Sequence, residues 1–155
     1  MIKALLFDMD GLLLDSERVV QESWNVAGET LGYGKVGEHI YNTLGMNVVG
    51  RKEYFSKVFG KEFPYEEFQN LSRKAFFKVA DQEGIPLKPG AKELIFYAKQ
   101  MGYKVGLVTS SRKEYAVDAL KKAGIFQYFD GCIFGDMGSK SKPNPEIYEK
   151  GCKML

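Results

Sequence analysis

The chain has 155 residues, 45% of them hydrophobic and 14% aromatic, which is enough apolar material for a packed interior. Its net charge is only +2, so we expect no dedicated nucleic-acid surface, which would be far more basic. No apolar run has the length of a membrane span, and MIKALLFDMD turns acidic too soon for a signal peptide. Cys132 and Cys152 lack metal-ligand spacing and need no disulfide framework, so we expect a cytoplasmic protein without membrane contact.

The pattern of the first 86 residues predicts one strand followed only by helices. An apolar run at residues 2–7 is cut off by acidic residues, as expected for a buried strand. Helices are expected from Ser16 to the glycines at 32 and 34, then twice between residues 35 and 59 with a break near 45–47, and again after Pro64.

From residue 87 onward the pattern alternates between helices and strands. The expected strands are residues 103–109 and 131–135. A helix opens at Gly90, and Asn144 and Pro145 cap the last one. Ser111 and Glu114 have the spacing of a capping box for the helix between the two strands. Such alternation favours parallel strands joined by right-handed crossovers.

We therefore predict an α/β protein with a Rossmann-like, parallel-sheet core and an inserted helical domain. The core comprises residues 1–15 and 87–155, and the insertion comprises residues 16–86. Because the insertion leaves after the first strand and returns before the second, we expect it to act as a lid over the carboxyl ends of the strands. The two connecting segments, near residues 14–15 and 87–88, are the expected hinges.

Asp8 and Asp10 stand two residues apart where the first strand is expected to end. In open α/β sheets, ligands bind beyond the carboxyl ends of the strands, so both side chains would project into that crevice. Close carboxylates repel each other unless a cation or proton is shared between them. Mg²⁺ prefers oxygen ligands and is often held by one or two carboxylates, so we expect Asp8 and Asp10 to bind Mg²⁺.

Hydroxyl and ammonium groups follow the other two expected strands. Thr109, Ser110 and Ser111 follow the second strand at a helix N-terminus, and Lys142 follows the third. Together with the two carboxylates, these donors and this positive charge suit a transferring phosphoryl group. One carboxylate can attack phosphorus to form an aspartyl-phosphate, and the other can protonate the leaving oxygen and later deprotonate water.

Three motifs in this order resemble those of the haloacid dehalogenase superfamily, in the branch with a helical cap between its first and second motifs. The resemblance covers essentially the whole chain. An apolar strand ending in Thr or Ser is matched at residues 105–109, and the lysine motif is matched by KPNPE at residues 142–146. The first family pattern, DxDGxxxDS, is matched at Asp8, Asp10, Gly11, Asp15 and Ser16.

The resemblance implies a role for each matched residue. Asp8 would be the nucleophile and a Mg²⁺ ligand, and Asp10 the general acid/base and a Mg²⁺ ligand through its backbone carbonyl. Thr109 and Lys142 would hold the phosphoryl group, with Ser110 beside them. An acidic residue two positions after the nucleophile resembles the phosphotransferases of the superfamily rather than its dehalogenases.

The sequence departs from the family pattern after the third motif. Family members carry a fourth, acidic motif after a fourth strand, and this sequence stops at Leu155 with the C-terminal strands missing. We therefore expect weakened or absent Mg²⁺ binding in this form. The fourth strand would normally flank the first, so we also expect residues 2–7 to form an open edge that invites pairing with another chain.

The predicted function is a Mg²⁺-dependent phosphatase acting on a small phosphorylated metabolite, with Gly45, Met46 and Asn47 as the cap segment facing the substrate. One alternative is a sugar-phosphate mutase resembling beta-phosphoglucomutase, favoured by Ser111 and Arg112. Against it, Val20 stands where that subfamily carries a histidine. The other alternative is a truncated, inactive form that self-associates through the strand at residues 2–7.

Overall fold

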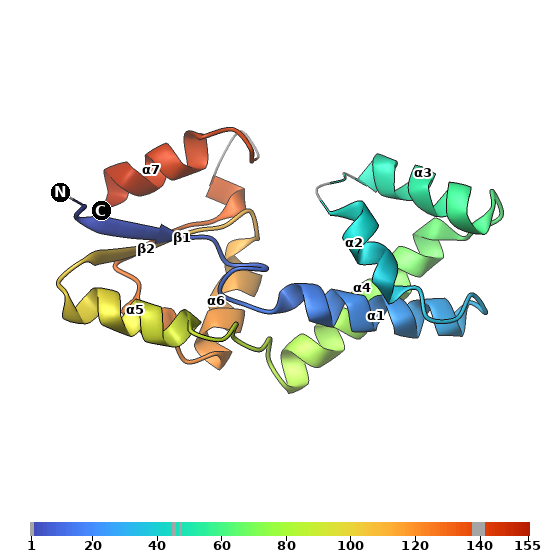
Figure 1. The fold of residues 1–155 in the computed structure, drawn as a ribbon, viewed down its shortest axis with the longest axis horizontal. Coiled ribbons are helices and arrows are strands. Elements are labelled where there is room, and N and C mark those ends of the chain that lie inside the picture. Colours follow the sequence, from blue (N-terminus) through green and yellow to red (C-terminus); the bar gives the residue numbers. More distant parts are fainter. Residues whose placement is uncertain (1, 45, 47, 138–141) are drawn as a thin grey trace. The chain divides into compact units, whose positions relative to one another are not determined.

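A computed structural model describes residues 2–44, 46, 48–137 and 142–155. The chain divides into two compact units, Met1–Ser16 with Gly84–Leu155, and Glu17–Glu83 (Figure 1). The first unit is discontinuous in sequence, and the second is the segment inserted into it. Within the described residues, no helix combines the length and the apolar character needed to cross a bilayer.

The first unit contains a three-stranded sheet in the order β1-β2-β3. Its strands are β1 (Ala4–Phe7), β2 (Lys104–Val108) and β3 (Gly131–Ile133), and both pairings are parallel, as predicted. Each strand is shorter than its apolar run. At the end of β3 the chain leaves the sheet because the Gly135 amide donates to the Ser111 carbonyl at 2.8 Å, and a 3₁₀ turn, η3 (Gly135–Met137), begins there.

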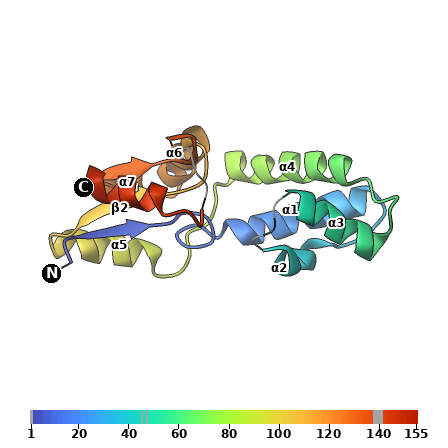
Figure 2. The same cartoon turned by 90° about the horizontal axis from the view of Figure 1, so that it is seen from above.

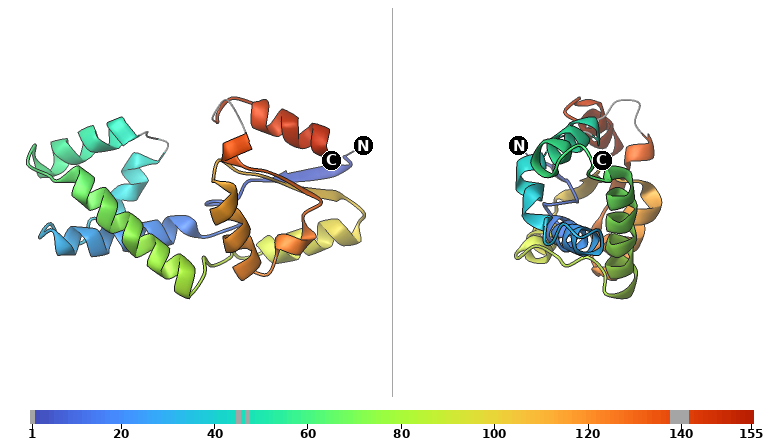
Figure 3. Two further views of the ribbon diagram at one scale, coloured as in Figure 1. Left: turned by 180° about the vertical axis from the view of Figure 1, so that it is seen from behind. Right: turned by 90° about the vertical axis from the view of Figure 1, so that its right-hand side faces the viewer.

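Helices cover both faces of this sheet. On one face α7 (Glu146–Met154) contacts all three strands, and α5 (Ala91–Gln100) contacts β2 on the opposite face (Figures 1 and 3). The close approach of α7 depends on Gly151, where a Cβ atom would lie 2.9 Å from Val108 Cγ2. Two further elements complete the unit: α6 (Lys113–Lys122) and the 3₁₀ turn η2 (Phe126–Tyr128), which contact each other.

The regular elements described in the second unit are all helical (Figure 2). They are four α-helices and one 3₁₀ turn: α1 (Ser16–Thr30), η1 (Gly37–His39), α2 (Ile40–Thr43), α3 (Val48–Phe59) and α4 (Tyr65–Gln82). Their core is aromatic: the Trp24 ring meets those of Phe55 and Phe68 edge-on, at centroid distances of 5.3 and 5.7 Å. Edge-to-face packing of this kind adds stability beyond the buried area.

The two segments that join the units pair with each other. The Asp15 amide donates to the Pro86 carbonyl at 2.8 Å, and the Lys88 amide donates to the Leu13 carbonyl at 2.8 Å. An ion pair of 3.0 Å joins Lys88 Nζ to Asp15 Oδ1. The predicted hinge segments are therefore held together as a short antiparallel pair.

Candidate active site

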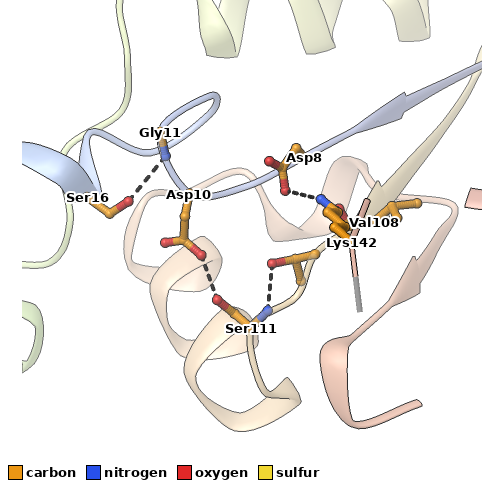
Figure 4. A network of polar contacts seen from close by, with 8 residues as sticks. Asp8, Asp10, Gly11, Ser16, Val108, Ser111 and Lys142 are labelled. Atoms are coloured by element: carbon orange, nitrogen blue, oxygen red, sulfur yellow. Dashed lines mark hydrogen bonds and ion pairs between the residues drawn. The ribbon is translucent and has the colours of Figure 1, made fainter. Parts of the chain in front are cut away.

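The two acidic residues follow β1 on the same side of the chain. Phe7 and Met9 are buried, and the alternation of an extended backbone turns Asp8 and Asp10 the other way, where both are half-buried. Gly11 then reverses the chain with φ = 75°, a conformation that favours glycine. Its amide donates to the Ser16 Oγ at 3.2 Å, which ties the turn to the start of α1 (Figure 4).

Lys142 meets Asp8 from the opposite end of the sequence. Its Nζ donates to Asp8 Oδ1 at 2.7 Å and to the Val108 carbonyl at 3.2 Å (Figure 4). Burial lowers the pKa of Lys142, but hydrogen bonds to Asp8 and Tyr148 and the charges of both outweigh burial and leave the pKa above its ordinary value. The ammonium therefore stays charged, and it faces the carboxylate that the sequence predicts as the nucleophile.

The segment after β2 supplies hydroxyl groups. Thr109 is buried, and its Oγ1 accepts a hydrogen bond from the Ser111 amide at 3.0 Å. Ser110 is exposed. The Ser111 hydroxyl donates to Asp10 Oδ2 at 2.6 Å, so the second predicted carboxylate is tied to the end of β2 (Figure 4).

The predicted capping box at Ser111 is wrong. The N-cap of α6 is Arg112, and no side chain makes a capping hydrogen bond there. The Ser111 hydroxyl instead donates its hydrogen bond to the Asp10 carboxylate. A hydrogen bond to a charged acceptor is roughly twice as strong as one to a neutral group, so the acidic partner, which lies about a hundred residues away in sequence, is favoured over the local amide.

Tyr115 is a site residue that the sequence analysis missed. It lies in the first turn of α6, and its hydroxyl donates to Asp10 Oδ1 at 3.2 Å. Burial raises the pKa of Tyr115, and the Asp10 charge and hydrogen bond raise it further, so the hydroxyl keeps its proton. Its place in the first turn of the helix that follows the second strand was the one available signal, because ligands bind beyond the carboxyl ends of the strands.

The oxygen atoms of Asp8 and Asp10 suit Mg²⁺. Among the described residues, no group of three or more His, Cys, Asp or Glu side chains gathers in a form that could hold a metal ion. Mg²⁺ is usually bound through one or two carboxylates together with substrate phosphate and water. The Asp8 carboxylate, with the Asp10 backbone carbonyl that the family resemblance implies, therefore fits Mg²⁺ that is bound along with a phosphate.

Four of the predicted site residues thus lie in the first unit, near the carboxyl ends of the strands: Asp8, Asp10, Thr109 and Lys142, with Ser110 in the same loop as Thr109. The contact between Asp8 and Lys142 joins residues 134 apart in sequence. The predicted substrate segment belongs to the other unit. Met46 is exposed there, and Gly45 and Asn47 lie outside the described residues.

The parallel sheet lies between helices, which defines a Rossmann-like α/β protein. Carboxylates, hydroxyls and an ammonium gather at the carboxyl ends of its strands, and the ammonium and hydroxyls could bind an anion there. The family model for haloacid dehalogenase-like hydrolases matches residues 2–155. The chain therefore belongs to the haloacid dehalogenase-like hydrolases, as its three motifs predict.

Relatives and solved structures agree with this assignment. The Bacillus subtilis (strain 168) protein "Putative phosphatase YhcW" is 35% identical over 159 residues, which cover all of this chain and 70% of the relative. The "Phosphorylated carbohydrates phosphatase" of Thermotoga maritima is 29% identical over 95% of this chain and 68% of the relative. The crystal structure of a "putative beta-phosphoglucomutase" from Thermotoga maritima is 26% identical with a TM-score of 0.78, covering 98% of this chain and 70% of that one.

Proposed function

We propose that this hydrolase is a phosphatase that releases inorganic phosphate from a small phosphorylated metabolite by way of an aspartyl-phosphate on Asp8. The observation that carries the proposal is the 2.7 Å contact between Asp8 Oδ1 and Lys142 Nζ, with Asp10 two residues away. A carboxylate beside a fixed ammonium can approach a phosphate dianion because the positive charge offsets their repulsion. The phosphatase names among the relatives support the same reaction.

The proposed reaction has two displacements. Asp8 attacks phosphorus, the ester P–O bond breaks, and the departing oxygen takes its electron pair together with a proton from Asp10. Water then attacks the phosphorus of the aspartyl-phosphate while Asp10 takes back a proton from it. The acyl-phosphate P–O bond breaks, and its electron pair returns to Asp8, so the products are the alcohol and inorganic phosphate.

The remaining residues are assigned to binding. Lys142 and the loop of Thr109 and Ser110 would hold the phosphoryl oxygens through their ammonium, hydroxyl and amide groups. Asp8 through its carboxylate and Asp10 through its backbone carbonyl would hold Mg²⁺, which would supply positive charge that screens the attacking carboxylate from the phosphate. The helical unit is the proposed source of substrate selectivity, with Gly45, Met46 and Asn47 as its contact segment.

The proposal is tested by Asp8→Asn, with release of inorganic phosphate measured over a panel of sugar and alkyl phosphates. Asn keeps the shape of the side chain but removes the nucleophile, so we expect turnover to fall by at least roughly 10³-fold. Asp136→Asn, at an exposed acidic residue in η3, is the matched control and should keep full turnover. An Asp8→Asn variant as active as the unmodified chain would refute the aspartyl-phosphate route.

A sugar-phosphate mutase is the second candidate, because a solved structure with a TM-score of 0.78 bears the name of a beta-phosphoglucomutase. Both reactions begin with the same phosphorylated aspartate and differ in what accepts the phosphoryl group. Incubation with a hexose 1-phosphate separates them: free phosphate supports the phosphatase, and an isomerised sugar phosphate without phosphate release supports the mutase.

A further inference from the structure

We infer that Tyr115 is a positioning residue that fixes the orientation of the Asp10 carboxylate for proton transfer to the leaving group. This inference rests on the proposed function, in which Asp10 is the general acid. It concerns a residue outside the three motifs that carry the family resemblance.

Two donors hold the Asp10 carboxylate, one on each oxygen. Tyr115 donates to Oδ1 at 3.2 Å, and Ser111 donates to Oδ2 at 2.6 Å. Both donors come from the segment that runs from the end of β2 into α6, about a hundred residues away in sequence. A single donor would leave the carboxylate free to swing about the bond to its Cβ, whereas two donors at different oxygens fix the plane of the group.

The Tyr115 side chain is suited to this task. Tyr115 is half-buried in the first turn of α6, and an aromatic side chain has only two rotatable bonds, so its hydroxyl is held in place at low entropic cost. The short Ser111 side chain approaches from the preceding loop. Because a carboxyl group exchanges a proton only along its lone-pair directions, fixing its plane determines where Asp10 can deliver one.

A positioning role predicts a dependence on the leaving group. An alkyl phosphate must have its departing oxygen protonated, whereas nitrophenolate leaves as a stable anion and needs no proton. The ratio kcat/KM reports the steps up to cleavage of the ester, before water attacks the aspartyl-phosphate. Misalignment of the general acid should therefore lower kcat/KM for alkyl esters and spare it for activated aryl esters.

The test compares the full chain with its Tyr115→Phe variant on glycerol phosphate and on 2,4-dinitrophenyl phosphate. Phe keeps the ring and its packing and removes only the donor. We expect kcat/KM to fall roughly tenfold on the alkyl ester, as part of the 10²–10⁴ that a general acid supplies, and less than about twofold on the aryl ester. Tyr97→Phe, at an exposed tyrosine of α5, is the matched control and should change neither value.

A double-mutant cycle shows whether Tyr115 acts through Asp10. In an Asp10→Asn background, Tyr115→Phe should cause no further loss on glycerol phosphate, because the group that it positions has been removed. Thermal midpoints of all variants, measured alongside, establish that they are folded.

Three results would overturn the inference. Equal losses on both esters would assign Tyr115 a purely structural role, as would an undiminished effect of Tyr115→Phe in the Asp10→Asn background. Unchanged kcat/KM on both esters would remove any role in the reaction. Failure of the proposed function looks different: the unmodified chain would hydrolyse neither ester, or Asp8→Asn would match it, and the role of Tyr115 would fall with the phosphatase.

Discussion

Gly135 lies directly against the loop that would bind phosphate. A Cβ atom at this position would overlap the Ser110 carbonyl oxygen, and the Gly135 amide is already hydrogen-bonded to the Ser111 carbonyl at 2.8 Å. Both neighbouring groups are backbone atoms, which cannot rotate away as a flexible side chain can. The loop at the end of β2 thus depends on a glycine that comes two residues after β3.

We predict that Gly135→Ala displaces this loop and weakens phosphate binding. A displacement of about 1 Å can cost up to about 10²-fold in rate, so we expect a loss of roughly tenfold or more in kcat/KM. Overpacking should also lower the free energy of unfolding by about 1–3 kcal/mol. Asp136→Ala, at the adjacent exposed residue, is the control, and equal activity of the two variants would contradict the prediction.

The ion pair of Asp8 sets an expectation for Mg²⁺ binding. The Asp8 carboxylate is paired with Lys142, so a dication must compete with this ammonium. We expect no micromolar Mg²⁺ affinity in calorimetric titrations of the chain alone. Inorganic phosphate should strengthen binding, because it draws the Lys142 ammonium away and supplies oxygen ligands.

Asp8→Asn is the control for this titration and should abolish the effect of phosphate on Mg²⁺ binding. Micromolar Mg²⁺ affinity without phosphate would contradict the expectation. So would Mg²⁺ binding that is the same with and without phosphate, since the prediction requires the two ligands to bind together.

At the scale of elements, Asp130 ties three parts of the first unit together. Lys99 in the last turn of α5 donates to both of its carboxylate oxygens at 2.8 Å, and the Val105 amide of β2 donates to Oδ2 at 2.8 Å. The Asp130 amide in turn donates to the Val105 carbonyl at 2.7 Å, immediately before β3. The hydrogen bond from Lys99 and then that from Val105 lower the pKa of Asp130.

We predict that Asp130→Asn destabilises the fold at neutral pH but not in acid. The pKa of Asp130 is lower in the folded chain than in the unfolded chain. The ionised carboxylate therefore stabilises the folded state, and this stabilisation is fully present above the unfolded pKa of about 3.9. That contribution is lost as the pH falls through the folded pKa. We expect a difference of up to about 1 kcal/mol in urea unfolding at pH 7, which narrows as the pH falls below about 4.

Asp118→Asn is the matched control, since Asp118 forms an exposed ion pair with Lys122 one turn away on α6. Such pairs contribute only a few tenths of a kcal/mol, so this variant should change stability less at every pH. A gap between Asp130→Asn and the unmodified chain that widened in acid would have the wrong sign and would refute the argument.

Most elements could be predicted from local patterns. Apolar runs predicted the three strands, and their alternation with helices predicted that they are parallel. A helix was predicted after Pro64, and α4 begins at Tyr65 with Pro64 as its N-cap. The capping box at Ser111 failed because its hydroxyl pairs with a carboxylate from a distant segment. The antiparallel pairing of Leu14 with Leu87 was also beyond reach, since no local pattern records which two connecting segments meet.

At the scale of the whole molecule, β1 lies at one edge of the sheet, in the described order β1-β2-β3. Ile2, just before the strand, is 69% exposed. An exposed edge strand is a template for pairing with another chain, so we predict that this chain self-associates as its concentration rises. Sedimentation velocity over a wide concentration range measures this directly.

Ile2→Lys should weaken self-association, because natural proteins protect edge strands with charge, lysine above all. Leu94→Lys is the control: Leu94 is also exposed, but it lies on α5 rather than beside the edge strand. A chain that stays monomeric at every concentration would rule out the edge as an interface. Equal weakening by both variants would point to general hydrophobic contact instead.

The sequence by itself determined the family and the parallel α/β core, and it predicted which residues form the candidate site. These follow from local apolar runs and from the DxDGxxxDS and KPNPE strings, which are readable without knowing what lies nearby. Only the tertiary structure decided that Lys142 touches Asp8, that Ser111 serves Asp10 rather than α6, and that Tyr115 belongs to the site. Contacts over a hundred or more residues are set by how strands and helices pack, and that packing is a property of the folded chain as a whole.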